Sequence, residues 1–277
     1  MADPKDATAA LEKLHAVLDR GKDGFVTAVS LHPENGFLDD ALPHLLRLTR
    51  LAALALHTDN LSDDGFLALA KVPVLIEIEL HAPEVGPPDS GARSCPRLQW
   101  DKLPRIRTVR LRGAGIGDRQ LQDVAASPVV QNLFLGGVAV TDKGLAHLRQ
   151  VKTLELLAVE STKVTADGVK ALVGIANLKS LTLSGAVLQA GGFRSLGAMT
   201  GLEYLNLEST DADVAHLFTL VNLTHLDLGY NPGVTDAGLK HLTQLLRLTE
   251  LRLYETKVTD DGEANLNRTL PALNVGR

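Results

Sequence analysis

Residues 154–177 read LELLAVESTKVTADGVKALVGIAN, and this stretch holds one complete structural unit. Leu154, Leu157 and Val159 follow the pattern L-x-x-L-x-L, which predicts a short strand with these side chains pointing inward. Thr165 then offers a hydroxyl that can cap the first turn of a helix, and the apolar residues after it follow helical spacing. The unit therefore predicts a strand, a corner and a short helix around one apolar core.

The strand pattern returns along nearly the whole chain, with valine or isoleucine allowed at its leucine positions. Successive copies are 24, 31, 24, 24, 24, 24, 21 and 25 residues apart. One unit cannot bury its apolar face alone, so units of this kind stack, and right-handed connections give a parallel sheet. The copies begin at Leu51, Leu75, Ile106, Val130, Leu154, Leu178, Leu202, Leu223 and Leu248.

The corner between strand and helix is also repeated. It reads VTDKGLAHL at residues 140–148, VTDAGLKHL at 234–242 and VTDDGEANL at 258–266. An aspartate in the first helical turn is stabilised by the helix dipole, and a glycine allows neighbouring coils to approach closely. We interpret these aspartates as helix-capping residues, although the same residue type could serve in catalysis or as a calcium ligand.

Together the strand and corner resemble the leucine-rich repeats, and the Thr-Asp-x-Gly-Leu corner is similar to that of the bacterial and F-box-associated members. The resemblance covers roughly residues 25–275. It implies an α/β fold: a right-handed, ribonuclease-inhibitor-like solenoid, shaped as a horseshoe, with a concave parallel sheet and short helices on the convex side. We expect one continuous domain, in which residues 1–24 form an N-terminal helical cap and residues 25–277 form about ten coils.

The cap is expected to be a single helix that starts at Asp3-Pro4 and ends at Gly21, because proline is favoured early in a helix and glycine after its end. Its apolar face consists of Ala7, Ala10, Leu11, Leu14 and Leu18.

The ninth position of the copies carries side chains that can bond backbone groups of adjacent turns. These residues are Asp59, Thr162, Thr210, Asn231 and Thr256.

Composition excludes several classes of protein. The 277 residues carry a formal charge of -5, which argues against a nucleic-acid partner. Cys95 is the single cysteine, so the chain has no internal disulfide and a reducing compartment, the cytoplasm, is expected. The first residues lack the charge pattern of a signal peptide, and no apolar run reaches the roughly 18 residues that a membrane helix needs.

Motifs for catalysis and cofactor binding are missing from the sequence, which contains no H-E-x-x-H, G-x-S-x-G, C-x-x-C or P-loop pattern. We therefore predict no catalytic residue, no cofactor and no metal site. The enzyme alternative would use Glu208, Asp227 and Glu250 as paired carboxylates, but an open sheet is wet and acid–base work favours a dry pocket.

Three histidines share one column of the repeat, directly after the strand pattern: His32, His57 and His81. Stacked coils would place them about 5 Å apart. Zinc needs convergent ligands, so a polar stripe sensitive to pH is the preferred interpretation.

The copy that begins at Leu75 is the longest, and its extra residues lie within 81–104, which contain Cys95 and Trp100. Insertions in solenoids often lie on a binding face. The alternative is that Leu98 and Trp100 cover a coil that lacks its helix.

The third, fifth and seventh residues of each copy should lie on the concave face. All three tyrosines of the chain fall on or beside this face in the last three full copies. Tyrosine and arginine are favoured at binding hot spots, so we predict a partner site here; cross-strand packing of aromatics is the structural alternative. The predicted site comprises Tyr204, Asn206, Glu208, His225, Asp227, Tyr230, Glu250, Arg252 and Tyr254.

The function that the resemblance implies is a non-catalytic module that binds a protein or peptide on its concave face. The mixed acidic charge around the aromatic residues predicts a partner with a basic or amphipathic surface, and we expect a monomer with neither nucleic acid nor membrane as partner. Related proteins also serve as substrate receptors in ubiquitin ligation, but about 25 residues before the first coil are too few for an F-box. A designed scaffold without a partner is a further alternative.

Overall fold

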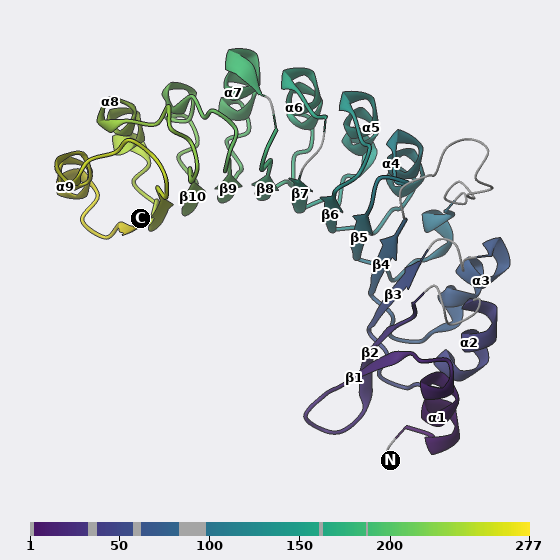
Figure 1. Cartoon of the computed structure of the whole chain (residues 1–277). Coiled ribbons are helices and arrows are strands. Elements are labelled where there is room, and N and C mark those ends of the chain that lie inside the picture. Colours follow the sequence, from purple (N-terminus) through teal and green to yellow (C-terminus); the bar gives the residue numbers. More distant parts are fainter. Residues whose placement is uncertain (1–2, 33–37, 58–61, 83–97, 161–162, 187) are drawn as a thin grey trace. The chain divides into compact units, whose positions relative to one another are not determined.

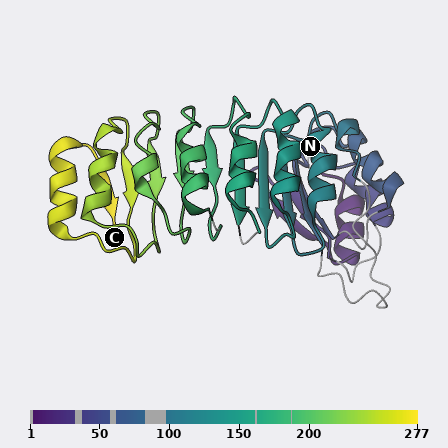
Figure 2. The same cartoon turned by 90° about the horizontal axis from the view of Figure 1, so that it is seen from above.

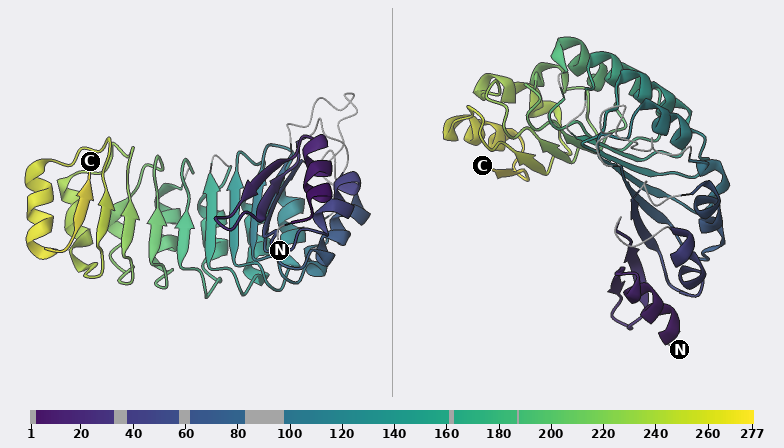
Figure 3. Two further views of the ribbon diagram at one scale, coloured as in Figure 1. Left: turned by 90° about the horizontal axis from the view of Figure 1, so that it is seen from below. Right: turned by 45° about the vertical axis from the view of Figure 1, so that its right-hand side comes forward.

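The computed structural model describes residues 3–32, 38–57, 62–82, 98–160, 163–186 and 188–277. The chain divides into two compact units, residues 1–139 and 140–277. In each unit the strands form a sheet and helices cover one of its faces (Figure 1). Figure 2 looks onto the helices of the second unit, and the left view of Figure 3 looks onto its strands. Both units therefore have the α/β architecture of a leucine-rich repeat solenoid.

In the first unit the strands lie in sequence order, from β1 to β6. β1 is antiparallel to β2, and each later strand is parallel to the one before it. The strands are β1 Val17–Arg20, β2 Val26–Ser30, β3 Ala53–His57, β4 Glu77–His81, β5 Thr108–Arg112 and β6 Asn132–Gly136. The helices and 3-10 turns are α1 Lys5–Lys13, α2 Leu38–Leu45, α3 Asp63–Ala68, η3 Leu69–Lys71, η4 Trp100–Lys102 and α4 Asp118–Ala125.

The second unit repeats this arrangement with parallel neighbours from β7 to β12. Its strands are β7 Leu156–Glu160, β8 Ser180–Thr182, β9 Tyr204–Asn206, β10 His225–Asp227, β11 Glu250–Arg252 and β12 Asn274–Gly276. The helices are α5 Asp142–His147, η5 Leu148–Gln150, α6 Ala166–Leu172, α7 Gln189–Gly197, η6 Val214–His216, α8 Asp236–Leu239, η7 Lys240–Gln244 and α9 Asp260–Thr269.

In the copy that begins at Leu154, the described residues fold as the sequence predicts. Leu154, Leu157 and Val159 are fully buried on the strand side. Thr165 is the N-cap of α6, and its hydroxyl accepts a hydrogen bond from the backbone N–H of Asp167 at 3.4 Å. The capping role of this threonine is therefore confirmed.

The aspartate of the corner does more than stabilise its own helix. The Asp142 carboxylate accepts hydrogen bonds from the backbone N–H and the hydroxyl of Thr165 in the next coil, at 2.8 and 2.7 Å. Asp236 holds Thr259 in the same way, at 2.8 and 2.7 Å. These bonds lower the pKa of Asp236, the backbone bond most strongly. The corner is thus a cross-coil clamp.

Glycine completes this clamp. A Cβ atom at Gly168 would overlap the Asp142 carboxylate, and one at Gly262 would overlap the Asp236 carboxylate. At these two corners the aspartate of one coil therefore occupies the space left by the glycine of the next coil.

The N-terminal cap differs from the single helix expected up to Gly21. α1 ends at Lys13, its N-cap is Pro4 rather than Asp3, and Leu18 lies in β1. Residues 17–20 form an antiparallel pair with β2, so their backbone groups are satisfied by a strand rather than a helix. Asp3 instead accepts a hydrogen bond from the backbone N–H of Val26 at 2.6 Å.

The ninth position of the repeat is only partly as predicted. Asn231 is fully buried and bonds the preceding coil, donating to Leu207 O at 2.8 Å and accepting from the N–H of Thr210 at 3.0 Å. The hydroxyls of Thr210 and Thr256 instead donate within their own coils, three residues back, because a short side chain reaches that carbonyl first. Asp59 and Thr162 lie outside the described residues.

The long copy is described only in part, and residues 83–97, with Cys95, lie outside the described residues. Leu98 and Trp100 are buried, and the indole ring of Trp100 meets the Phe66 ring edge to face at 5.2 Å. These two residues therefore contribute to the core, as the structural interpretation predicts.

Candidate functional site

Three neighbouring strands of the second unit bring the predicted site residues together. The register pairs Tyr204 with His225 and His225 with Glu250. Two residues further on, Asp227 of β10 pairs with Arg252 of β11. Successive side chains of a strand alternate between its faces, and the residues between these positions are buried leucines. The polar side chains consequently share the face of the sheet that the helices leave open.

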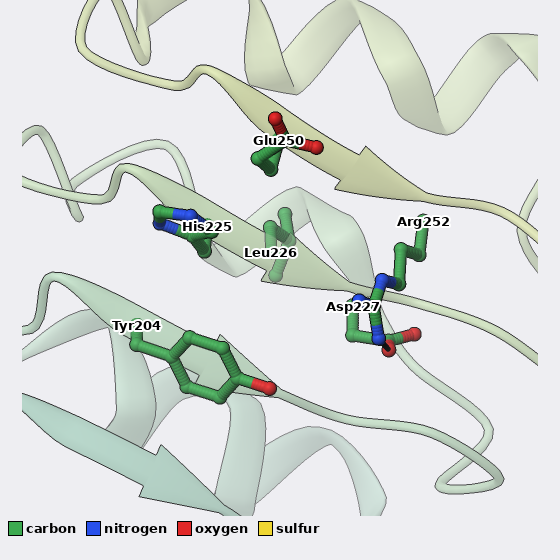
Figure 4. Close-up of a pocket in the computed structure, with 6 residues that line it drawn as sticks. All are labelled: Tyr204, His225, Leu226, Asp227, Glu250 and Arg252. Carbon is green, nitrogen blue, oxygen red and sulfur yellow. Dashed lines mark hydrogen bonds and ion pairs between the residues drawn. The ribbon is translucent and has the colours of Figure 1, made fainter. Parts of the chain in front are cut away.

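A hollow of about 190 Å³ lies on this face (Figure 4). It is open to solvent and spans β9, β10 and β11. Its lining combines one aromatic residue, one histidine, two carboxylates and one guanidinium, with Leu226 between them; the residues are Tyr204, His225, Leu226, Asp227, Glu250 and Arg252.

The aromatic wall of the hollow comes from β9 and β10. The rings of Tyr204 and His225 lie 6.0 Å apart, tilted by 32°. His225 Nδ1 lies 2.9 Å from the hydroxyl of Thr224, which fixes the orientation of the imidazole. Figure 4 shows both rings beside the same opening, with Glu250 across from Tyr204.

Two carboxylates form the charged wall. Asp227 is only 7% exposed, and its Oδ1 accepts the N–H of Gly229 at 2.9 Å. Its Oδ2 lies 3.5 Å from Nη1 of Arg252, whose side chain is 60% exposed. Glu250 accepts a hydrogen bond from Nδ2 of Asn274 at 3.0 Å. Both carboxylates are thus fixed in place beside the hollow.

The other two tyrosines lie in the turns that follow β10 and β11. Tyr230 is 54% exposed and Tyr254 41% exposed. The N–H of Tyr230 donates to the carbonyl of Tyr254 at 2.7 Å, which ties the two turns together. A Cβ atom at Gly276 would lie 2.9 Å from the Tyr254 hydroxyl, so this side chain reaches across to β12.

Tyr230 also has an unusual backbone. Its φ is +56°, in the left-handed region, whereas the equivalent eighth position of earlier copies holds Gly113, Gly137 and Gly185 with φ of +96°, +61° and +73°. A bulky residue in this region is a true outlier, and it costs on the order of 1–3 kcal/mol. The fold favours glycine here, so the tyrosine has another reason to be present.

Asn206 is the last residue of β9, and Glu208 lies two residues after it. The side chain of Asn206 accepts the backbone N–H of Glu208 at 2.8 Å, which stabilises the end of β9. Neither residue lines the hollow. The left-handed backbone of Tyr230 was not predicted from the sequence. Glycine at three equivalent positions of other copies could have indicated it.

The histidine column of the first unit forms as its spacing predicts. The rings of His32 and His57 lie 6.1 Å apart, and those of His57 and His81 lie 5.2 Å apart and stack. Nε2 of His81 lies 3.0 Å from Glu79, which also accepts from Arg112 at 2.7 Å. Among the described residues, no group of three or more histidine, cysteine or acidic side chains is placed to hold a metal.

Comparisons with known proteins agree with the repeat. The sequence model of the family described as Leucine Rich repeat matches residues 219–242. An internalin, inlF, from Listeria monocytogenes has a similar structure, with 17% identity and a TM-score of 0.53 over 84% of this chain and 69% of that chain. Rad7, solved in complex with Elc1 in yeast, has 15% identity and a TM-score of 0.52 over 90% of this chain and 75% of that chain. A search of curated protein sequences gives no match.

The repeated strand and corner, the stacked coils and these matches define one class. The chain has the leucine-rich repeat fold, and the family model matches one of its copies. Proteins of this fold generally present an extended surface to protein partners. Within the described ranges, none of the helices is both long and apolar enough to span a membrane.

Proposed function

We propose that this chain is a non-catalytic interaction module that binds a protein or peptide on the open face of β9, β10 and β11. Tyr204 and the two exposed tyrosines in the following turns are its anchors. The observation that carries the proposal is the left-handed backbone of Tyr230, an exposed bulky side chain at a glycine position. Strain of this kind is retained where function requires it.

An enzymatic role is less well supported by the site. Of the three carboxylates that could act together, Glu208 does not line the hollow that Asp227 and Glu250 share. The hollow is open to water, whereas general acid–base catalysis works best where a carboxyl is desolvated. A binding role needs only a rigid surface, and the clamped coils provide one.

A receptor role in a ubiquitin-ligase-like complex is a narrower version of the same function. The similarity to Rad7, which was solved in complex with Elc1, concerns the fold alone at 15% identity. It does not favour a receptor subunit over other binding modules. A reducing compartment such as the cytoplasm suits a chain with one cysteine, and a monomer leaves the open face free.

The test compares capture of partners by the immobilised protein and by matched variants. Tyr204→Ala and Tyr254→Ala should each weaken capture by more than about 30-fold, the equivalent of about 2 kcal/mol for an anchor residue. Phe218→Ala is the matched control, because Phe218 is as exposed as Tyr254 but follows η6, away from the strands.

The readout is quantitative mass spectrometry of proteins bound from a lysate, with thermal melting of every variant alongside. Loss of the same bound protein in both tyrosine variants and its retention in Phe218→Ala supports the proposal. Equal capture by all four proteins, or unfolding of both tyrosine variants, shows that the tyrosines only pack on the sheet.

A further inference from the structure

The hollow on β9, β10 and β11 is too small for a large ligand. Sites for drug-sized molecules enclose about 300–1,000 Å³, whereas this hollow encloses about 190 Å³. One long side chain is a better match. We propose that the hollow receives an arginine side chain from an extended segment of the partner, an inference that rests on the proposed function.

The buried carboxylate is the first reason. Asp227 is almost fully buried, yet its charge is only partly compensated. Oδ1 takes one short hydrogen bond from Gly229, while Oδ2 has Arg252 at 3.5 Å, beyond the usual range of an N–H···O bond. A carboxylate can accept about four hydrogen bonds. Asp227 therefore keeps acceptor capacity toward the hollow that it lines.

The second carboxylate makes the site suitable for a forked cation. Glu250 lies on the neighbouring strand and borders the same hollow. Nδ2 of Asn274 holds one of its oxygens, Oε2, at 3.0 Å. A guanidinium carries five N–H donors in a planar fork, so it can donate hydrogen bonds to both carboxylates at the same time. A lysine ammonium is a compact point charge and lacks this geometry.

The rings of Tyr204 and His225 supply the third element. They stand at one side of the opening, with the carboxylates of Asp227 and Glu250 on the other sides (Figure 4). Guanidinium groups stack on aromatic faces as well as pairing with carboxylates. An arginine that enters the hollow can therefore stack and form ion pairs together.

The acidic charge of the surrounding face also favours a partner segment that contains arginine. The five full copies that begin between Leu154 and Leu248 hold four acidic residues at the third, fifth and seventh positions and one basic residue. Arg252 is that basic residue, and it stands at the rim with most of its side chain exposed. Complementary charge steers a basic segment to this face. The acidic residues are Glu160, Glu208, Asp227 and Glu250.

The experiment uses the full chain labelled with ¹⁵N and three peptides, acetyl-Gly-Gly-X-Gly-Gly-amide with X as arginine, lysine or citrulline. Citrulline has the shape of arginine without its charge. The arginine peptide should shift the amide signals of β9, β10 and β11, and it should bind at least tenfold more tightly than the citrulline peptide and more tightly than the lysine peptide.

Two variants and a control locate the effect. Asp227→Asn and Glu250→Gln should each weaken the arginine peptide at least tenfold. Glu160→Gln makes the same change of charge on the same face, outside the hollow, and should alter binding less than twofold. Glu250→Gln keeps the test decisive if the buried Asp227→Asn variant does not fold.

Equal binding of arginine and citrulline, equal binding of arginine and lysine, or equal effects of all three variants would overturn the arginine site. These outcomes leave the proposed function standing if Tyr204→Ala and Tyr254→Ala still abolish capture of the partner. The opposite result is also informative. If the arginine peptide binds but neither tyrosine variant loses capture of the partner, the arginine site is supported and the proposed tyrosine-anchored binding surface is overturned. If the protein is a dimer and the arginine peptide dissociates it, the occupant of the hollow is a second copy of this chain. That result would overturn the proposal that the arginine comes from a different protein.

Discussion

The cross-coil clamp predicts that Gly168 and Asp142 are energetically coupled. Gly168→Ala places a methyl group where the Asp142 carboxylate lies, so the carboxylate must rotate away and release Thr165. Two hydrogen bonds are then lost, at about 1 kcal/mol each. Alanine in a helix regains about 1 kcal/mol relative to glycine. The net expectation is a loss of about 1 kcal/mol in the free energy of unfolding.

The same substitution should behave differently once the carboxylate is absent. In an Asp142→Ala background the methyl group no longer meets the carboxylate, and only the tight contacts with Val164 and Leu145 oppose the helical gain. Gly168→Ala should then be neutral or stabilising by up to about 1 kcal/mol. The coupling between the two sites is therefore expected to be about 1–2 kcal/mol, above the few tenths that independent sites show.

Urea unfolding of the parent, both single variants and the double variant measures this coupling. Gly238→Ala serves as the control, because a methyl group there would approach Val214 rather than a carboxylate. Its effect should be unchanged by Asp142→Ala. Additive effects of Asp142→Ala and Gly168→Ala, within about 0.5 kcal/mol, would refute the clamp.

Three other residues give predictions of their own. Tyr230→Gly should leave stability unchanged or raise it by about 1 kcal/mol, because relief of the left-handed strain outweighs or balances the entropy of glycine, while capture of the partner falls; destabilisation on urea unfolding would contradict this. Asp236 has a lowered pKa, so its stabilising effect is present above its ordinary pKa and is lost as pH falls through the lowered value; acid titration of stability should be flatter in Asp236→Asn, and an unchanged curve would count against the bonds to Thr259. Asn231→Ala should cost more than about 3 kcal/mol, because it leaves several buried backbone groups unpaired; a melting temperature close to that of the parent would be inconsistent with the buried network.

The fold can be predicted from sequence because one signal recurs. Each copy places its leucines at the same positions, and a recurring period fixes both the strand and its register with the next copy. This is why the spacing predicts one column for His57 and His81, whose rings stack in the structure, and one row for Tyr204, His225 and Glu250. Periodicity alone therefore locates the columns of the open face.

Contacts that depend on the shape of a turn cannot be read in this way. The spacing within a copy does not reveal that Asp142 reaches Thr165 of the next coil, because that contact depends on how closely two corners stack. Likewise, Leu18 suits an apolar face of a helix and of a strand equally well. Pairing with β2 decides the outcome, and pairing is a tertiary effect.

The backbone of the second unit gives an independent reason to look for function at its tyrosines. In the turns after β5, β6 and β8, glycine occupies the eighth position of the copy with positive φ. After β9, β10 and β11 the same position holds Ser209, Tyr230 and Glu255, with φ of +55°, +56° and +53°. A scaffold optimised only for stability would keep glycine in all six turns, since local preference and fold then agree. The three turns that lack glycine follow the three strands that line the hollow. Backbone strain, exposed aromatic side chains and acidic charge therefore occur together on one face, as expected for a surface retained for binding.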